Sequence, residues 1–414
     1  MRSSRGPAMT LVAVAILAAA MTLRPGATSV GPVLAEISTG LGLSSGTAGL
    51  VTALPGFMFA LGGVAAVPLS RRLGVGATIG TGLLLTAACL LARPYVGSAG
   101  LFVLLSALAL IGMAVGNVLV PAVIRIFGRD KPAFLAGIYS TGLAVGGAAP
   151  LLVAGLLLAA TGGWQPALAT WGLFSLMAAV VWGVLMARSA GRLGRVASAR
   201  PAAGPGAATS QESAQVAAHG RPVWRSRTAV ALALFFGLQS TNAYIQFGWM
   251  SQIYRDAGLS LGTASVLVGM IAFLGVPGGF ATSWMVSNSR HLAGWIIGMG
   301  ACMVLGYGGL LLAPATVPLL WALLLGLGSL AFPTALALIT ARTRDPAVTA
   351  RVSGFIQPAG YLMAGAGPLL IGLIHGWTGS WTVPLLLLLA SSFALAYFGS
   401  RVANGGYIDD ELLT

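Results

Sequence analysis

Residues 147–164 read GAAPLLVAGLLLAATGGW, and residues 365–381 read GAGPLLIGLIHGWTGSW, which is a similar pattern with one residue deleted. A second pair precedes the first in each half of the chain: GLSSGTAGLV at 42–51 matches GLSLGTASVL at 258–267. Matches that recur in the same order indicate internal repetition of a structural unit. The chain is therefore predicted to contain two copies of one unit.

Both copies consist almost wholly of apolar residues. Hydrophobic residues make up 57% and charged residues 7% of the 414-residue chain, and the mean hydropathy is +0.91. A soluble domain carries about 25% charged residues, so a soluble globular protein is excluded. Apolar runs of roughly 20 residues, the length that spans a bilayer, recur near residues 9–35, 48–69, 76–93, 99–124, 133–160, 164–187, 228–254, 262–285, 291–312, 317–340, 348–374 and 381–400. The predicted fold class is an all-α membrane protein with twelve transmembrane helices in two pseudo-symmetric six-helix bundles.

The predicted domains follow from these runs. Residues 1–188 are expected to form an N-terminal six-helix bundle, residues 228–401 a C-terminal one, and residues 402–414 a cytoplasmic tail. Residues 189–227 are rich in Ala, Gly, Pro and Arg, and include the run PAAGPGAATSQESAQ. A segment with so little apolar content does not fold by itself. We therefore predict that it is a flexible cytoplasmic linker.

The charge distribution predicts the orientation. The chain has 22 Lys and Arg against 8 Asp and Glu, a net charge of +14, and cytoplasmic loops are enriched in Lys and Arg. If the N-terminus is cytoplasmic, every Lys and Arg falls in a cytoplasmic segment except Arg24, Arg93 and Arg255. Arg93 and Arg255 then fall on the outer side and Arg24 within the first helix. Both termini are predicted to be cytoplasmic, and no nucleic-acid partner is needed to explain the positive charge.

Two six-helix halves joined by a cytoplasmic linker are the architecture of the major facilitator superfamily. Within it, the chain resembles the cyanate-permease and nitroimidazole-transporter (CynX/NimT) family, through LRPGATSVGP (23–32), GNVLVP (116–121) and the helix-seven segment at 232–260. Segments 331–346 and 353–381 extend the resemblance over nearly the whole chain outside the linker.

This resemblance implies secondary active transport by alternating access, with a substrate site near the bilayer midplane between the halves. The solutes would be cyanate-like inorganic anions or compact nitro-heterocycles. The partners would be the small-molecule substrate and the lipid bilayer of the cytoplasmic membrane, and the protein would act as a monomer. One departure from the superfamily pattern lies in VPLSRRLGVG (67–76), where Arg71 replaces the usual acidic residue of the loop. It puts in doubt the conformational latch that this acid provides, but not the fold.

Arg24 is the leading candidate for the substrate site. It lies about fifteen residues into the first helix, where a charged side chain costs several kcal/mol and is expected to face a cavity or a partner. Its guanidinium offers a permanent charge and forked donors that suit a small anion. The nearest acid along the helix, Glu36, lies roughly 18 Å away, too far for direct pairing. Pro25 and Gly26 are expected to unwind the helix locally.

Polar side chains on three other helices complete the candidate site. Gln239, Asn242 and Gln246 recur at helical spacing on one face of the seventh helix, and Gln357 and Tyr361 share a face of the eleventh. Each set suits a polar solute, and the amides of the seventh helix have hydrogen bonds between helices as the alternative explanation.

Asn117 in the fourth helix is a further candidate. It lies near Pro121 within the family-like segment GNVLVP. It could bind substrate or brace a kinked helix. Both interpretations stay open.

Several chemistries have no support in the sequence. None of the eight acids is predicted at mid-membrane, so the carboxylate that commonly binds cations or relays protons is missing. There is no phosphate-binding loop of the G-x4-GK[ST] type, no cluster of metal ligands and no arrangement of nucleophile and base. An enzyme, a metal site and a cofactor are therefore not expected. Multidrug efflux within the same superfamily remains the alternative function.

Overall fold

The computed structural model describes residues 9–128, 131–193 and 221–413. Throughout this part of the chain the ordered elements are helices, and no strand occurs. This confirms the predicted all-α class. Of the predicted linker, residues 194–220 lie outside the described residues.

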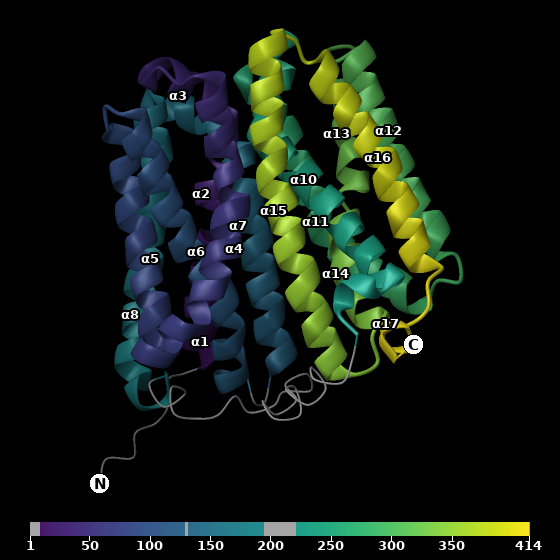
Figure 1. The fold of residues 1–414 in the computed structure, drawn as a ribbon. Coiled ribbons are helices and arrows are strands. Elements are labelled where there is room, and N and C mark those ends of the chain that lie inside the picture. Colours follow the sequence, from purple (N-terminus) through teal and green to yellow (C-terminus); the bar gives the residue numbers. More distant parts are fainter. Residues whose placement is uncertain (1–8, 129–130, 194–220, 414) are drawn as a thin grey trace. The chain divides into compact units, whose positions relative to one another are not determined.

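The first half of the chain forms the helices of one compact unit (Figure 1), which also includes residues 247–252 and 260–269. Its elements are α1 (Met9–Thr22), α2 (Pro25–Thr28), η1 (Gly31–Val33), α3 (Leu34–Leu41), α4 (Ser45–Leu73), α5 (Val75–Ala92), η2 (Arg93–Tyr95), α6 (Ala99–Phe127), α7 (Pro132–Thr161) and α8 (Trp164–Leu193).

Most of the second half forms another compact unit. The elements of this half are η4 (Val223–Arg225), α10 (Arg227–Asp256), α11 (Leu261–Asn288), α12 (Leu292–Leu312), α13 (Pro318–Gly328), α14 (Ala331–Ala341), α15 (Pro346–Thr378), α16 (Thr382–Ala403) and α17 (Ile408–Leu413).

These helices are built to cross a bilayer. Among the described residues, eleven helices are long and apolar enough to span it, and Leu261–Gly275 of α11 is a shorter apolar segment in the place of the twelfth. A helix satisfies its backbone hydrogen bonds internally, which lipid demands of any spanning segment. Large apolar side chains such as Leu156 and Val64 are strongly exposed on the outside of the first unit. In a water-soluble protein such a surface would be a liability, whereas in a bilayer it contacts lipid.

The two sequence repeats fold into the same local structures. Gly162 ends α7 and Gly379 ends α15, both in the left-handed region, with φ of 71° and 62°. The preceding threonine hydroxyl bonds a carbonyl one turn back in each case, Thr161 to Leu157 (2.7 Å) and Thr378 to Ile374 (2.8 Å). Glycine is suited to the left-handed cap because it has no Cβ. The duplicated sequence therefore encodes duplicated helix ends.

The second repeat pair specifies helix starts. Ser44 precedes α4 and accepts a hydrogen bond from the backbone N–H of Thr47 (3.2 Å). Ser260 precedes α11 and accepts the equivalent bond from Thr263 (3.2 Å). A serine in this position satisfies one of the free N–H groups of a helix N-terminus.

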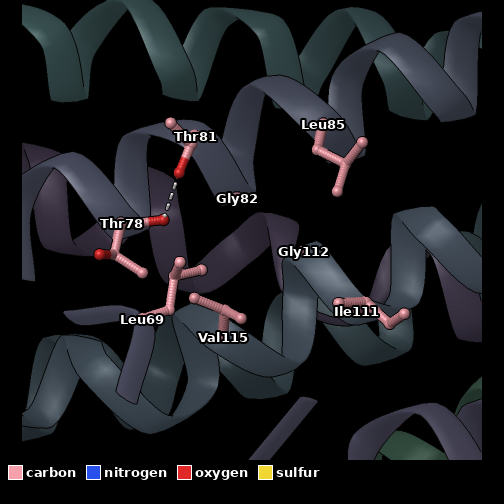
Figure 2. Close-up of a pocket in the computed structure, with 8 residues that line it drawn as sticks. All are labelled: Leu69, Thr78, Thr81, Gly82, Leu85, Ile111, Gly112 and Val115. Carbon is pink, nitrogen blue, oxygen red and sulfur yellow. Dashed lines mark hydrogen bonds between the residues drawn. The ribbon is translucent and has the colours of Figure 1, made fainter. Parts of the chain in front are cut away.

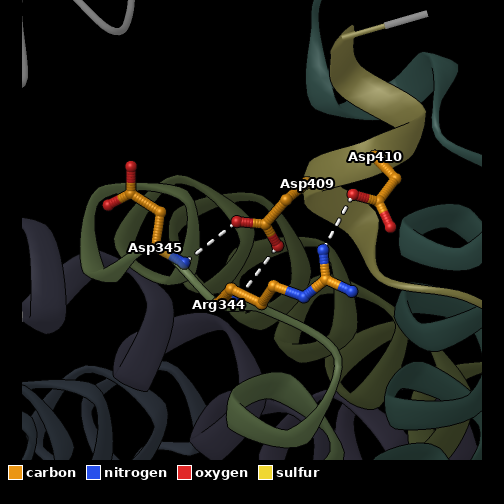
Figure 3. Close-up of polar contacts among 4 residues, drawn as sticks. All are labelled: Arg344, Asp345, Asp409 and Asp410. Carbon is orange, nitrogen blue, oxygen red and sulfur yellow. Dashed lines mark hydrogen bonds and ion pairs between the residues drawn. The ribbon is translucent and has the colours of Figure 1, made fainter.

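The predicted C-terminal tail is folded rather than extended. Residues of α17 cap two other helices of the second unit with their carboxylates. Asp409 accepts hydrogen bonds from the backbone N–H groups of Arg344 (3.0 Å) and Asp345 (2.9 Å) at the start of α15, as Figure 3 shows. Asp410 pairs with the Arg344 guanidinium at 3.1 Å.

Glu411 caps the start of α10 in the same way. It accepts from the Ser226 hydroxyl (2.7 Å) and the Thr228 N–H (3.1 Å), and it also bonds the Thr228 hydroxyl. Negative charge is favourable at a helix N-terminus. These contacts tie the end of the chain to the helix that opens its C-terminal half.

Glu411 predicts a pH-dependent stability. Burial raises its pKa, but the hydrogen bonds from Thr228 and Ser226 outweigh burial, so the pKa lies below its ordinary value of 4.5. A carboxyl whose pKa is lower in the folded state stabilises it fully above the ordinary pKa. That contribution is lost as the pH falls below 4.5 through the native pKa. Loss of such a cap costs roughly 0.5–2 kcal/mol.

Melting temperatures of the detergent-purified protein and of Glu411→Gln, measured from pH 7.5 down to pH 3.5, test this. The wild type is expected to melt higher at neutral pH, and the two curves should converge in acid. Asp410→Asn, which breaks an exposed pair that contributes little, is the matched control. A gap between wild type and Glu411→Gln that persists in acid would contradict the prediction.

Candidate substrate-binding site

The first membrane span is broken at Arg24. Helix α1 ends at Thr22, and α2 begins only at Pro25, so Leu23 and Arg24 lie between two helical pieces. The Arg24 carbonyl accepts hydrogen bonds from the N–H groups of Ala27 (2.9 Å) and Thr28 (3.2 Å). Proline lacks an N–H and cannot continue the preceding helix without losing a bond. The local unwinding predicted from Pro25 and Gly26 is confirmed.

The Arg24 side chain is half-buried and has no polar partner among the residues that the structure describes. Its Cζ lies 5.9 Å from the centroid of the Phe59 ring on α4, a cation–π distance. Its stem passes beside Gly147 of α7, where an added Cβ would stand 3.8 Å from the Arg24 Cβ and Cγ. Within the described part of the chain, its guanidinium makes no hydrogen bond and no ion pair. All five guanidinium N–H donors are therefore available to a bound solute.

Helix α7 holds this break in place through close backbone packing. A Cβ at Gly142 would stand 2.7 Å from the Ala20 Cβ, and one at Gly146 would stand 2.3 Å from the Met21 carbonyl oxygen. Small residues let membrane helices approach this closely. The Gly-x3-Gly spacing on this helix therefore serves packing, and it places α7 against the residues just before Arg24.

A second arginine lies near the break, and sequence reasoning missed it. Arg93 was expected on the outer side, but its side chain is 0% exposed. It donates to the carbonyl of Gly26 (3.2 Å) and to the hydroxyls of Ser29 (3.2 Å) and Ser106 (3.3 Å). Charge counting places an arginine at a helix end but cannot tell whether the protein covers it. The available signal was that Arg93 directly follows an unbroken apolar run.

In the second unit, two predicted site residues belong to a buried network. The Tyr307 hydroxyl of α12 donates to Asn242 Oδ1 (2.9 Å) and accepts from Gln246 Nε2 (2.9 Å). Asn242 Nδ2 also donates to the Ser391 hydroxyl (3.0 Å), and the Ser329 hydroxyl donates to Gln246 Oε1 (3.3 Å). Both amides are 1% exposed. Asn242 and Gln246 thus make the hydrogen bonds between helices that the sequence analysis gave as the alternative to substrate binding.

The network predicts a stability effect for Tyr307→Phe. Losing the hydroxyl removes one partner from each of the two buried amides. Interhelical hydrogen bonds in membrane proteins contribute about 0.6 kcal/mol on average and up to roughly 1.7 kcal/mol, so the two bonds together should lower the melting temperature by several degrees. Tyr397→Phe, at a 58% exposed tyrosine of α16, is the control. Equal melting temperatures for the two variants would show that the network does not stabilise the bundle.

The other predicted residues of the second unit are placed differently. Gln239 is 4% exposed, and its Nε2 donates to the neighbouring Ser240 hydroxyl (2.7 Å). Gln357 and Tyr361 on α15 are half-buried. The Tyr361 ring meets the Phe236 ring edge to face, with centroids 5.7 Å apart. An aromatic wall beside amide groups suits a flat polar solute.

Asn117 of the first unit lies on α6 and is half-buried. The Tyr139 hydroxyl of α7 lies 2.9 Å from its Oδ1 and 3.1 Å from its carbonyl oxygen. The contact supports a bracing role for the side chain, while half-burial leaves part of the amide open. Both interpretations from the sequence therefore stay in place.

A pocket in the first unit is lined by none of these candidate residues. It has a volume of about 310 Å³ and is lined by residues of α4, α5 and α6: Leu69, Thr78, Thr81, Gly82, Leu85, Ile111, Gly112 and Val115. Figure 2 shows the Thr81 hydroxyl donating to the Thr78 carbonyl, a bond of 3.0 Å. The Thr78 hydroxyl donates to the Gly74 carbonyl at 2.8 Å. Both hydroxyl protons are already in use, so the pocket is poorly suited to a polar solute.

Four carboxylates of the second unit bond groups at helix ends. Asp345, Asp409, Asp410 and Glu411 make these bonds at the starts of α10 and α15. Within the described residues, no group of three His, Cys, Asp or Glu side chains could hold a metal ion.

Comparison with known proteins places the chain in a family. The sequence pattern of the Major Facilitator Superfamily matches residues 10–368. The 2-nitroimidazole transporter of Escherichia coli is 33% identical over 93% of each chain. The uncharacterized transporter YycB of Bacillus subtilis is 30% identical over 95% of this chain and 93% of the relative. The cyanate transport protein CynX of Escherichia coli is 25% identical over 87% of this chain and 89% of the relative.

Solved structures agree at the level of the fold. The nucleoside transporter NupG superimposes with a TM-score of 0.76 at 11% identity, covering 96% of this chain and 99% of that one. The D-xylose–proton symporter superimposes with a TM-score of 0.74 at 12% identity, covering 95% and 96%. Because the family pattern and two relatives at 30% identity or more extend over most of the sequence, the chain belongs to the Major Facilitator Superfamily and is a transporter of the group that contains the 2-nitroimidazole and cyanate transporters.

Proposed function

We propose that this transporter carries a small anionic or electron-rich polar solute, such as a cyanate-like anion or a nitro-heterocycle, and that Arg24 anchors it. The observation that carries the proposal is the Arg24 guanidinium, which has no hydrogen bond or ion pair among the described residues. A charge placed within a membrane span at a cost of several kcal/mol is expected to have a functional partner. A solute with negative charge or lone pairs is that partner.

The chemistry of guanidinium narrows the solute class. Its planar fork of donors matches the oxygens of a nitro group or carboxylate in a bidentate way, and its charge attracts a small anion. The Phe59 ring near the Arg24 Cζ adds an apolar wall that would suit a flat ring. The named substrates of two relatives, 2-nitroimidazole and cyanate, fall in this same class. This agreement supports the proposal for the present chain.

The remaining candidate residues would form a polar shell around the solute. We assign direct contacts first to Gln357 and Tyr361, which are half-buried, because Gln239, Asn242 and Gln246 are buried and bonded within the protein. Asn117 would contact the solute through the part of its amide that does not bond Tyr139. Because no carboxylate among the described residues pairs with Arg24, a coupled proton would enter with the substrate or through another group of the protein. The transporter would work by alternating access in the cytoplasmic membrane.

Uptake into proteoliposomes tests the solute class. The purified protein is reconstituted and offered radiolabelled cyanate, 2-nitroimidazole or the lipophilic cation tetraphenylphosphonium, with empty liposomes as the control. We expect saturable uptake of cyanate or 2-nitroimidazole, with mutual inhibition if both share the site, and none of the cation. Transport of the cation alone would overturn the proposal and favour multidrug efflux.

A further inference from the structure

The segment that carries Arg24 is braced by Arg93. Both Arg93 contacts on this segment fall within the short helix α2 or at its end: the Gly26 carbonyl bonds Nη1, and the Ser29 hydroxyl bonds Nη2. The other side of the guanidinium faces α6, where Ser106 accepts a bond and the Phe102 ring lies 5.7 Å from Cζ. Arg93 therefore links the break in the first span to the third and fourth spans.

We propose that Arg93 is the positioning residue for Arg24, fixing the shape of the break so that the Arg24 guanidinium is presented to the solute. This inference rests on the proposed function, because it assumes that Arg24 binds the solute. The two arginines then have different roles. Arg24 keeps its donors free, while Arg93 uses Nη1 and Nη2 on its own protein and is closed to solvent.

Helix α2 connects Arg93 to Arg24 structurally. Arg24 is the N-cap of α2, and its carbonyl accepts the N–H groups of Ala27 and Thr28. The tilt of α2 therefore sets the direction in which the Arg24 side chain leaves the backbone. A helix break leaves carbonyl groups without intrahelical partners, and in a membrane these must be satisfied by the protein. Arg93 supplies such a partner at Gly26.

The chemical identity of Arg93 also points to positioning. Among the described residues no carboxylate pairs with it, so its burial is not repaid by an ion pair. Replacing a buried charge that has no ionic partner leaves no opposite charge stranded in the interior. Methionine could fill this space but could not bond Gly26 and Ser29. Lysine would keep the charge but would lose the planar fork that bonds two residues at once.

Hydrogen–deuterium exchange of the break tests the first half of the inference without any substrate. Purified Arg93→Met is compared with wild type by mass spectrometry. We expect exchange within residues 25–30 to rise roughly tenfold while the core of α5 and α6 is unchanged. Ser29→Ala, which removes only one contact, should give a smaller rise at the same place. Unchanged exchange at the break would overturn the inference.

Transport kinetics test the second half. For a solute that the wild type carries, Arg93→Met should raise KM about tenfold with Vmax within about twofold of wild type, because a displaced anchor weakens binding. Arg93→Lys should recover part of this loss. In an Arg24→Gln background, Arg93→Met should change the affinity for the same solute no further, because the anchor is already gone.

These experiments distinguish failure of the positioning role of Arg93 from failure of the proposed function. A normal KM in Arg93→Met despite faster exchange at the break would overturn the positioning role and leave the role of Arg24 intact. Wild-type transport by Arg24→Gln would overturn the proposed function itself. In that case the exchange experiment still reports whether Arg93 holds the break.

Discussion

Arg24→Ala is expected to lower kcat/KM for transport of the anionic or electron-rich solute by about 100-fold. Each hydrogen bond to a charged group contributes roughly 1.5–3 kcal/mol, and two of them from one guanidinium account for such a loss. Arg24→Lys keeps the charge without the fork and should retain activity between that of the wild type and Arg24→Ala. Initial rates of uptake into proteoliposomes, over a range of solute concentrations, measure both.

The same variant has an expected effect on stability with the opposite sign. Removing a charge that has no partner among the described residues should leave the melting temperature of the empty protein unchanged or raise it, as is common at functional sites. A fall in melting temperature together with the loss of transport would mean that Arg24 acts in folding. Wild-type transport by Arg24→Ala would remove the anion anchor from the mechanism.

Gly146→Ala should be strongly destabilising, because the added methyl would meet the backbone of α1. The added Cβ would stand 2.3 Å from the Met21 carbonyl oxygen and 2.9 Å from its Cα. Backbone atoms cannot rotate away as a side chain can, so α1 and α7 must separate. Overpacking of this kind costs on the order of 3 kcal/mol. Thermal unfolding in detergent should show a lower melting temperature, and the yield of folded protein should fall.

The adjacent glycine provides the control. At Gly147 a Cβ would meet only Arg24 side-chain atoms at 3.8 Å, an ordinary contact. Gly147→Ala adds the same methyl to the same helix and should melt close to wild type. If both alanine variants melt alike, close approach of α1 and α7 at Gly146 is not what holds the break.

Much of the fold could be predicted because the decisive properties are local. The apolar runs matched the helices closely: the span predicted near 99–124 is α6 (Ala99–Phe127), and that near 133–160 is α7 (Pro132–Thr161). Proline and glycine after Arg24 broke the first span where expected. The span predicted near 317–340, in contrast, is two helices, α13 and α14, separated at Ser329 and Leu330. Ser329 bonds Gln246 there, a contact 83 residues away in the chain.

The candidate site could be predicted only in part, because the bonding partners of its residues lie on other helices. A stripe of amides on one helix face identifies Asn242 and Gln246 as unusual, but it does not name their partners. Tyr307, which bonds both, lies in another helix and belongs to an apolar run without a motif. The tail likewise contains two carboxylates that cap helices, those of Asp409 and Glu411, and its sequence does not show this. Helical periodicity shows which residues share a face, not what that face meets.

The membrane class, the duplicated unit and the arginine within the first span could all be recognised from the order of residues alone, and the same order predicts the orientation of the loops. Each depends on the hydropathy, charge or backbone preference of neighbouring residues. The packing of the helices shows that Arg24 has no bonded partner among the described residues, while Arg93 is buried and bonded to Gly26, 67 residues away. Whether a polar group is already hydrogen-bonded or can still bind a solute depends on the groups packed against it. In this chain those neighbouring groups come from helices that are distant in the sequence.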